Sequence, residues 1–321
     1  MQPITDAFVT MLLVSQLSTS RVDDARPLTC EEYHRLRRQV EKLPYMRLNR
    51  LMNTDVNTLK SLLKLSEDQA FRICLLLSRS LLLEHQKQQF ENNGIHIMTY
   101  GEDGYPKRLD ERLENHTPPL LYYCGDTRLA GSTSAAILGN TCSRQDVLEC
   151  ADELSRILCR NGITLVTGGE NGFGKLIERN SLQYDGSVVS FIGGQLSEHI
   201  YQSGLCELIA MKRALVMSMV HPDAEYTTPH ALDRNRCLYS LANGVFIISC
   251  EKERGITWDG AVNALKSDYA GKIYVWENRE LPGNMELIAR GAIGFRHPNE
   301  LSCEQLKQEW EMPGGQQLSM F

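Results

Sequence analysis

The feature that most constrains the fold is a series of short apolar runs between residues 135 and 277. They are AAILG (135–139), ITLVTGG (163–169), SVVSFIGG (187–194), LVMSMV (215–220), VFIISC (245–250) and KIYVWE (272–277). Several runs are apolar without alternation, as strands buried on both faces are. Helical segments lie between the runs, for example Ser143 to Asn161 with Ser143 as N-cap and Gly162 just past its end. Strand–helix repetition predicts an α/β fold with a mostly parallel sheet and helices on both faces.

The first ninety or so residues have a helical pattern instead. Thr29-Cys30-Glu31-Glu32 and Ser66-Glu67-Asp68-Gln69 are capping boxes that begin helices. The second helix is predicted to carry Ala70, Ile73, Leu77 and Leu81 on one stripe, and Gly94 is predicted to end the helical part. We therefore expect a small all-helical domain over 1–93, an α/β domain over 94–300, and a C-terminal helix and tail over 301–321.

Composition excludes several classes of protein. The chain of 321 residues has a net charge of -6, so any nucleic-acid binding must come from a local basic patch. The ten cysteines form no C-x-x-C pair and no zinc pattern, so we predict neither a metal site nor a disulfide scaffold. There is no signal-peptide pattern and no apolar run near the roughly 20 residues that span a membrane, which favours a cytoplasmic protein.

The loop TGGENGFGK (167–175) leaves two interpretations open. From Gly169 it has the G-x-x-x-x-G-K spacing of a P-loop, but Leu176 stands where a magnesium-binding Ser or Thr is needed. One interpretation is an anion-binding turn, in which backbone N–H groups and Lys175 approach a phosphate. The other is a tight turn whose glycines only allow strand and helix to pack. Ligands of parallel sheets bind beyond the carboxyl ends of the strands, which places Gly139, Gly168-Gly169 and Gly193-Gly194 on the predicted binding edge.

A second informative segment is Arg234-Asn235-Arg236, which we expect at the start of the helix that leads into strand 245–250. Two guanidinium groups beside the carboxyl edge of a sheet can bind phosphate. The simpler alternative is a solvated helix start whose arginines pair with the carboxylates of Asp223, Glu225 and Asp233.

Taken together, these segments resemble the DNA-processing protein A (DprA, also called Smf) family. The matching motifs, in the family's order, are Tyr105-Pro106, Pro118-Pro119-Leu120-Leu121-Tyr122, Ile137-Leu138-Gly139, the glycine loop 167–174, Arg234-Asn235-Arg236, residues 254–261 and residues 283–292. The match covers about 95 to 300, and it identifies TGGENGFGK with the family's glycine turn and not with a P-loop.

The resemblance implies a Rossmann-like domain that binds single-stranded DNA through phosphate contacts, forms a homodimer and acts with a RecA-type recombinase, without catalytic residues. Carried onto this chain, it implies that phosphate is bound by Arg234, Arg236, Lys175, Gly139 and the amides of Gly168, Gly169 and Gly172. Asn235 would hold the loop or contact the ligand. Thr257 would cap the following helix, which is the simpler role, or donate to phosphate.

Some positions depart from the family's pattern. The family's G-[ST]-R reads Gly139-Asn140-Thr141, so that arginine is missing, and Arg144 is either its substitute or a surface residue. Glu170 and Glu178 add negative charge where phosphate is expected. We also expect no C-terminal winged-helix domain, which many relatives carry.

These departures favour an alternative, a regulatory, antitoxin or nucleotide-sensing protein of an antiphage defence gene pair with a phosphoribosyltransferase-like toxin as partner. A basic stretch would then offer a partner surface or a second phosphate surface, although a solvated helix face is simpler: Arg35, Arg37, Arg38, Lys42, Arg47 and Arg50. A third interpretation, cleavage of nucleoside monophosphates, needs a P-G-G-x-G-T loop that the sequence lacks. We therefore predict no enzyme activity and no cofactor.

Overall fold

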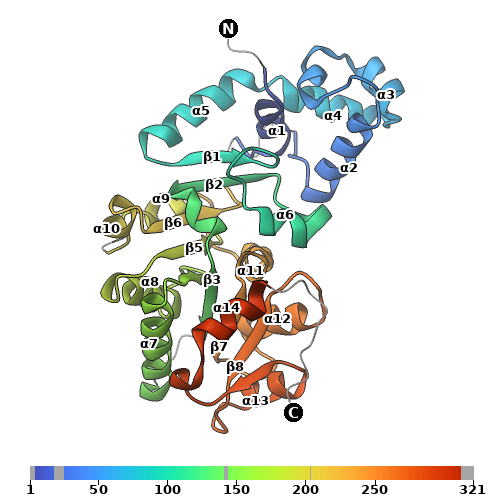
Figure 1. Ribbon diagram of the computed structural model, residues 1–321. Helices are drawn as coiled ribbons and strands as arrows, with labels where there is room; N and C mark the ends of the chain where they lie inside the picture. The colour runs from blue at the N-terminus through green and yellow to red at the C-terminus, as the bar shows by residue number, and fades with distance from the viewer. Residues whose placement is uncertain (1–3, 18–24, 141–143, 203, 312–321) are drawn as a thin grey trace. The chain divides into compact units, whose positions relative to one another are not determined.

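The computed structural model describes residues 4–17, 25–140, 144–202 and 204–311, which fall into two compact units (Figure 1). The first unit comprises Met1–Tyr105, Glu114–Cys124 and Met219–Pro222, and the second comprises Pro106–Leu113, Gly125–Ser218 and Asp223–Phe321. Each unit thus combines segments that are far apart in the sequence. The domain limits predicted above at 93/94 and 300/301 stay predictions.

The first unit is mainly helical. Its elements are α1 (Asp6–Val14), α2 (Cys30–Glu41), η1 (Leu48–Asn53), α3 (Val56–Leu63), α4 (Glu67–Leu77), α5 (Ser80–Asn92), η2 (Glu114–His116), and the strands β1 (His96–Thr99) and β2 (Leu120–Gly125). The two strands pair antiparallel, with His96 opposite Tyr123. Side chains such as Leu12, Leu51 and Leu76 are fully buried and form its core.

Both predicted capping boxes are confirmed, because Thr29 and Ser66 each accept from the backbone of the third helical residue while that residue's side chain accepts from the cap. Gly94 follows the end of α5 with a φ of +72° and confirms the predicted stop. The predicted stripe through Leu81 is wrong. Helix α4 ends at Leu77, and Leu81 lies in α5 with 83% of its surface exposed.

The second unit is built on a parallel sheet. Its described strands are β3 (Ser134–Gly139), β4 (Thr164–Thr167), β5 (Val188–Ile192), β6 (Ala214–Ser218), β7 (Gly244–Ser249), β8 (Lys272–Trp276) and β9 (Ile293–Phe295). They lie side by side in the order β6-β5-β4-β3-β7-β8-β9, and every neighbouring pair is parallel. All residues of β3 to β7 are buried, as the unbroken apolar runs predict.

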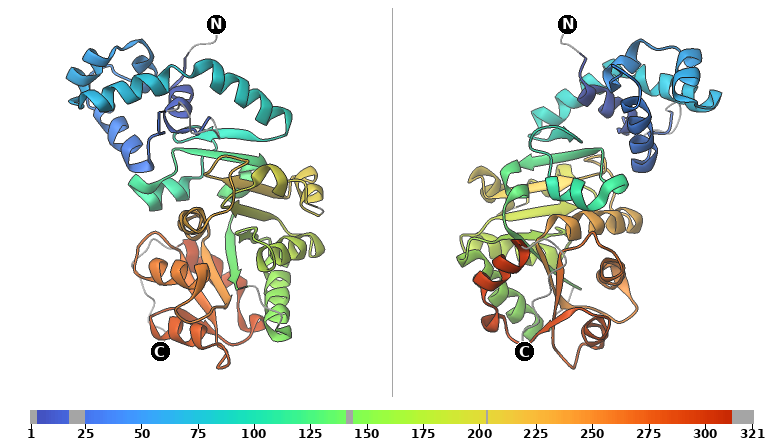
Figure 2. Two further views of the ribbon diagram at one scale, coloured as in Figure 1. Left: turned by 180° about the vertical axis from the view of Figure 1, so that it is seen from behind. Right: turned by 45° about the vertical axis from the view of Figure 1, so that its right-hand side comes forward.

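Helices cover both faces of this sheet, which confirms the predicted α/β class (Figure 2). Helices α7 (Gln145–Arg160) and α8 (Phe173–Gln183) contact each other and the strands β3 and β4. Helix α11 (Thr228–Leu241) packs on β3 and β5 and contacts α6 (Lys107–Leu113) and α12 (Gly255–Leu265). The remaining described elements are η3 (Thr127–Gly131), α9 (Leu196–His199), α10 (Leu205–Ala210), α13 (Pro282–Ala289), η4 (Pro298–Glu300) and α14 (Cys303–Glu311).

Helix α7 begins next to Arg144, one of the expected site residues. The predicted N-cap Ser143 lies outside the described residues, and the cap position falls on Arg144, which makes no side-chain cap hydrogen bond. Gly162 follows Asn161 with a φ of +68°, as predicted for the helix end.

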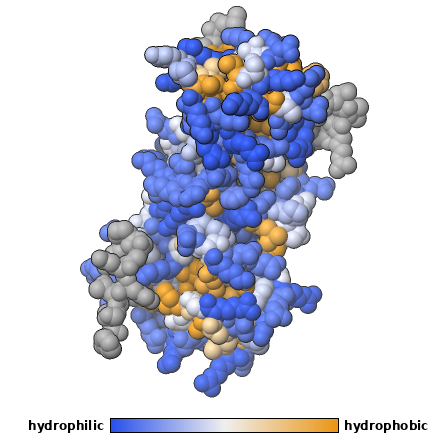
Figure 3. All heavy atoms as spheres, turned by 90° about the vertical axis from the view of Figure 1, so that its right-hand side faces the viewer, coloured by the Kyte–Doolittle hydropathy of each residue, from blue (hydrophilic) through white to orange (hydrophobic). Residues whose placement is uncertain are grey.

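The visible surface is largely hydrophilic, with hydrophobic side chains in separate patches (Figure 3). The exposed large hydrophobic side chains of the first unit include Leu62, Phe71 and Leu75. Within the described ranges, no helix has the length and apolarity required to cross a membrane.

Candidate functional site

The carboxyl ends of β3, β4 and β5 meet at one edge of the second unit's sheet, because the three strands are parallel neighbours. Gly139 is the last residue of β3, Gly168-Gly169 follow β4, and Gly193-Gly194 follow β5. The predicted collection of glycines at one edge is therefore confirmed as an arrangement. Whether it binds phosphate is a separate question.

The loop between β4 and α8 needs its glycines. Gly169 and Gly172 have φ values of +65° and +92°, which side chains other than glycine adopt at a cost. A Cβ atom on Gly139 would lie 2.7 Å from the ring of Phe173, and one on Gly174 would lie 2.9 Å from the backbone of Gly169. These close approaches place the first turn of α8 directly on the ends of the strands. Its N-cap position is Gly172, so no side chain of that residue caps the first amides of the helix.

Arg234 lies in the middle of α11, and the prediction that it sits at a helix start is wrong. Thr227 caps the helix through a bond from the amide of His230, and Pro229 occupies its first turn, so the helix begins at Thr228. The sequence Thr-Thr-Pro carries this earlier start signal. The consequence is that Arg234 approaches the sheet edge from the side of α11 and not from its end.

Arg234 is only 3% exposed, and its guanidinium lies over the end of β4. A Cβ atom on Gly168 would lie 1.5 Å from Nη1 of Arg234, so only glycine leaves room for the guanidinium there. Nη1 is 3.1 Å from Oε2 of Glu170, and Nε donates to the carbonyl of Ala231. Oε2 of Glu170 also lies where Cβ atoms on Gly168 and Gly174 would stand, at 2.3 and 3.0 Å. A carboxylate therefore occupies the space between the arginine and the glycine turn.

The other two residues of Arg234-Asn235-Arg236 point elsewhere, because successive residues of a helix are about 100° apart. Asn235 is buried and donates from Nδ2 to the carbonyl of Ile256, which ties α11 to α12. The Arg236 side chain is 50% exposed and lies 3.6 Å from Asp233 on the same helix. Asn235 therefore has a bracing contact, and Arg236 is open to solvent.

Three further expected site residues lie near this edge with different surroundings. Lys175, in the first turn of α8, is exposed. Arg144 pairs with Asp146 and Glu280 at 2.7 and 2.6 Å, and these hydrogen bonds raise the pKa of its guanidinium. Two carboxylates thus already neutralise it. Thr257 is the third residue of α12, whose N-cap is Arg254, so the predicted capping role for Thr257 is wrong.

A buried polar cluster beneath the glycine turn was not predicted. Oε1 of Glu178 accepts hydrogen bonds from Oγ of Ser190 at 2.5 Å and from Nε2 of His199 at 2.8 Å. All three side chains are buried. The expectation that Glu178 adds charge to the phosphate site is therefore wrong, because its carboxylate points into the protein. The serine inside the otherwise apolar run SVVSFIGG was the available signal for this cluster.

His199 links the cluster to the turn. A Cβ atom on Gly169 would lie 2.9 Å from the imidazole of His199 and 2.6 Å from Cγ2 of Ile192. The imidazole, itself fixed by Glu178, thus supports the backbone of the turn from below. The arrangement above it comprises the start of α8, the guanidinium of Arg234, the ammonium group of Lys175 and the carboxylate of Glu170.

Comparisons with known proteins identify the family of this chain. A family model described as DNA recombination-mediator protein A matches residues 96–305. DNA processing protein DprA of Bacillus subtilis (strain 168) is 23% identical over 169 residues, which cover 52% of this chain and 56% of that protein. The chain thus spans little more than half the length of this curated relative.

Two solved structures share the fold. The X-ray structure of DprA from Streptococcus pneumoniae has a TM-score of 0.60 and 19% identity, and the match covers 85% of this chain and 96% of that one. DprA from Helicobacter pylori, solved to study its single-stranded DNA binding mode, has a TM-score of 0.56 and 24% identity, covering 67% and 98%. The family model matches well over half of the chain, and the chain therefore belongs to the DNA recombination-mediator protein A family.

Proposed function

We propose that this protein binds single-stranded DNA through phosphate contacts at the carboxyl edge of β3, β4 and β5, without enzyme activity. The observation that carries the proposal is the guanidinium of Arg234 over Gly168, beside the first turn of α8. Helix-start amides and a guanidinium together bind phosphate oxygens well.

The remaining ligands of the proposed site differ in how accessible they are. Arg236 and Lys175 are exposed and can contact neighbouring phosphates of an extended strand. Arg144 is held by two carboxylates and Asn235 by Ile256, so we assign neither a main role. Gly139, Gly168, Gly169 and Gly172 provide the close backbone approach, and Thr257 offers a hydroxyl donor at the start of α12.

Binding of this kind depends on salt. For single strands, each neutralised phosphate makes the binding constant fall by about 0.7 logarithmic units for every tenfold increase in salt concentration. We expect little sequence preference, because phosphate contacts carry no base information. By family membership we further propose a homodimer that acts with a RecA-type recombinase.

The test is fluorescence anisotropy of a labelled oligonucleotide with the wild type and an Arg234→Ala/Arg236→Ala variant, at low and physiological salt. The proposal predicts salt-sensitive binding by the wild type and a loss of about tenfold or more in the variant. The matched control is Arg160→Ala/Arg179→Ala, which removes two exposed charges from α7 and α8.

Absence of binding by the wild type at low salt would contradict the proposal and favour the regulatory alternative. That alternative would then be tested by capture of a partner protein with the purified chain. Base release from nucleotides in a single-turnover assay would contradict the non-enzymatic assignment.

A further inference from the structure

A second cluster of cations lies in the helical unit. It occupies the segment Lys42–Arg50, which follows α2 and includes the first three residues of η1. The side chains of Lys42, Arg47 and Arg50 are exposed and form no hydrogen bond or ion pair with any residue that the structure describes. We call this stretch the 42–50 loop.

Four other cations of the unit, in contrast, are paired with carboxylates. Arg26 and Arg72 pair with Glu32, Lys60 pairs with Glu67, and Lys87 pairs with Glu91. Two acidic side chains beside the loop are already engaged: Glu41 accepts from Arg37, and Asp6 accepts from the amide of Asn49. The positive charge of the loop is therefore available to an outside ligand.

Tyr45 makes the loop more than a charged surface. Its ring is 90% exposed, and its φ is +60°, a left-handed conformation that Gly and Asn adopt more easily than tyrosine. An aromatic ring that neither packs in the core nor suits its backbone gains nothing for folding. Such outliers are concentrated at binding sites.

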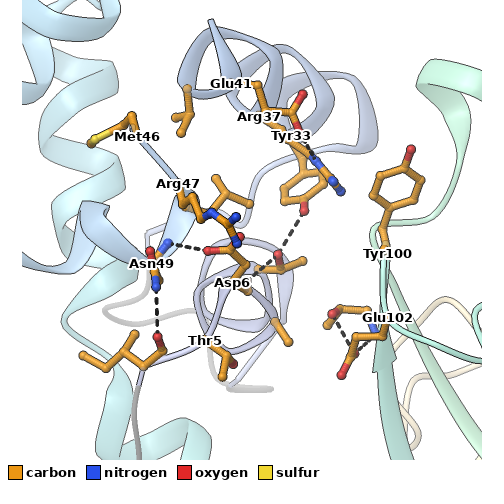
Figure 4. A pocket seen from close by; sticks show the side chains of 17 residues that line it. Thr5, Asp6, Tyr33, Arg37, Glu41, Met46, Arg47, Asn49, Tyr100 and Glu102 are labelled. Carbon is orange, nitrogen blue, oxygen red and sulfur yellow. Dashed lines mark hydrogen bonds and ion pairs between the residues drawn. The ribbon is translucent and has the colours of Figure 1, made fainter. Parts of the chain in front are cut away.

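The surface beside Tyr45 is hollowed. A hollow of about 650 Å³ is lined by the loop, including Tyr45, Arg47 and Arg50. It shares Glu41, Met46, Arg47 and Asn49 with a neighbouring hollow of about 750 Å³, whose lining Figure 4 shows. In the second hollow, the guanidinium of Arg37 lies 4.4 Å from the ring centre of Tyr100. Arg47 thus lines both hollows.

We propose that the 42–50 loop is a second binding site for single-stranded nucleic acid, with phosphates on Lys42, Arg47 and Arg50 and a base stacked on Tyr45. Cations combined with exposed aromatic rings are the means by which proteins bind single strands regardless of sequence. Binding of an acidic protein would use the cations of the loop but would not require the exposed ring of Tyr45. The site lies wholly within the helical unit and stands independently of the one around Arg234.

The first test compares oligonucleotide binding by the full chain and three variants across a salt series. Lys42→Ala/Arg47→Ala/Arg50→Ala should make the negative slope of log affinity against log salt less steep by about 2, as three lost phosphate contacts predict. Tyr45→Asn, which suits the left-handed backbone, should weaken binding about fivefold or more by removing the stacking ring. The control Arg26→Ala/Lys60→Ala/Lys87→Ala removes three paired charges of the same unit and should leave the slope unchanged.

The second test is photocrosslinking of a 5-iodouracil oligonucleotide, with the crosslinked peptide identified by mass spectrometry. A crosslink at Tyr45, retained in the Arg234→Ala/Arg236→Ala variant, supports the loop site even if the site at the sheet edge fails. The proposal is overturned if the loop variants match the wild type in slope and affinity, or if Tyr45→Asn is neutral while the triple variant weakens binding. That last result would assign the loop to a generic anion or an acidic protein. A wild type that binds no oligonucleotide at low salt overturns both sites.

Discussion

Oε2 of Glu170 lies 3.1 Å from Nη1 of Arg234, in the space that phosphate would take between the guanidinium and the glycine turn. Glu170 is partly exposed, whereas Arg234 is buried, so the carboxylate is the more mobile member of the pair. A DNA phosphate would have to displace it. The pair therefore neutralises the buried guanidinium. In the proposed site, this competition would lower the affinity for DNA.

Glu170→Gln should tighten oligonucleotide binding about three- to tenfold at low salt, because the arginine loses its internal partner. Anisotropy titration measures this directly. Asp185→Asn is the matched control for the change in net charge, since Asp185 is an exposed carboxylate beyond the far end of α8. An equal gain in both variants would mean that only net charge matters and that Glu170 does not occupy the site.

Gly168 and Gly169 are adjacent, yet alanine should act differently at each. A Cβ atom on Gly168 meets the flexible ends of Arg234 and Glu170, which can move away. A Cβ atom on Gly169 meets Ile192 and His199, and the φ of +65° is itself unfavourable for alanine. We expect Gly169→Ala to lower the free energy of unfolding by about 2–4 kcal/mol and Gly168→Ala by about 1 kcal/mol or less.

The variant that loses less stability, Gly168→Ala, should lose more of its affinity for DNA. Gly168→Ala should weaken binding strongly because it moves Arg234, while its melting temperature stays near that of the wild type. Thermal unfolding by circular dichroism and anisotropy on the same samples provide both numbers. Equal melting temperatures for the two variants would contradict the packing described for Gly169.

The six strands predicted from apolar runs were recognisable because strands buried on both faces leave an unbroken hydrophobic signal. β1, β2 and β9 were missed for physical reasons. β1 and β9 are short and partly exposed, and β2 follows directly on two prolines. Brief or half-buried strands carry too few apolar residues to stand out from loops.

Tertiary contacts explain the two misplaced helical features. Leu81 was assigned to the stripe of α4 because nothing in the local sequence ends that helix. The break comes from Arg79, which is buried at the N-cap of α5 and donates to the carbonyls of Leu12 and Ser15 at the end of α1. Such a contact between helices distant in sequence has no local signature. The position of Arg234 was misjudged although its signal, Thr227-Thr228-Pro229, was present.

The residues of the candidate site were predictable from the sequence, but the electrostatics around them were not. The glycines and Arg234 were named from the motif order, and they do lie at one edge. Spacing alone could not reveal that Glu170, in the loop before α8, faces Arg234 while Glu178, in the helix, faces inward, because both directions depend on tertiary packing. Burial, and not sequence position, decides which carboxylate faces Arg234.

Glu178 should matter for stability and not for charge at the site. Replacing it with leucine leaves the buried donors of Ser190 and His199 without their acceptor, which should cost about 2–4 kcal/mol in urea unfolding. Glu178→Gln keeps one acceptor oxygen and should cost less. The exposed neighbour Glu198 offers the control, and Glu198→Gln should change stability by no more than about 0.5 kcal/mol.

A different carboxylate should make the helical unit sensitive to acid. Hydrogen bonds from Arg72 hold the pKa of Glu32 at about 2 against burial, which acts in the opposite direction. Arg72 also donates to the carbonyls of Arg26 and Pro27, so it fixes the chain that enters α2. A carboxyl whose pKa is lower in the folded than in the unfolded state adds stability above its unfolded pKa of about 4.3. That stability is lost as the pH falls toward 2.

Arg72→Met keeps an apolar stem and removes the guanidinium. At pH 7 the variant should be less stable than the wild type by about 1–2 kcal/mol, after allowing for the partial exposure of Glu32 to solvent. The difference in stability between the two proteins should narrow steadily between about pH 5 and pH 2, because protonated Glu32 no longer forms an ion pair with Arg72. Melting temperatures of both proteins across this range test the sign. Lys60→Met, which breaks an exposed pair with Glu67 in the same unit, should show a smaller difference at pH 7. A gap between wild type and Arg72→Met that stays constant down to pH 2 would mean that Arg72 acts through its two carbonyl contacts and not through Glu32.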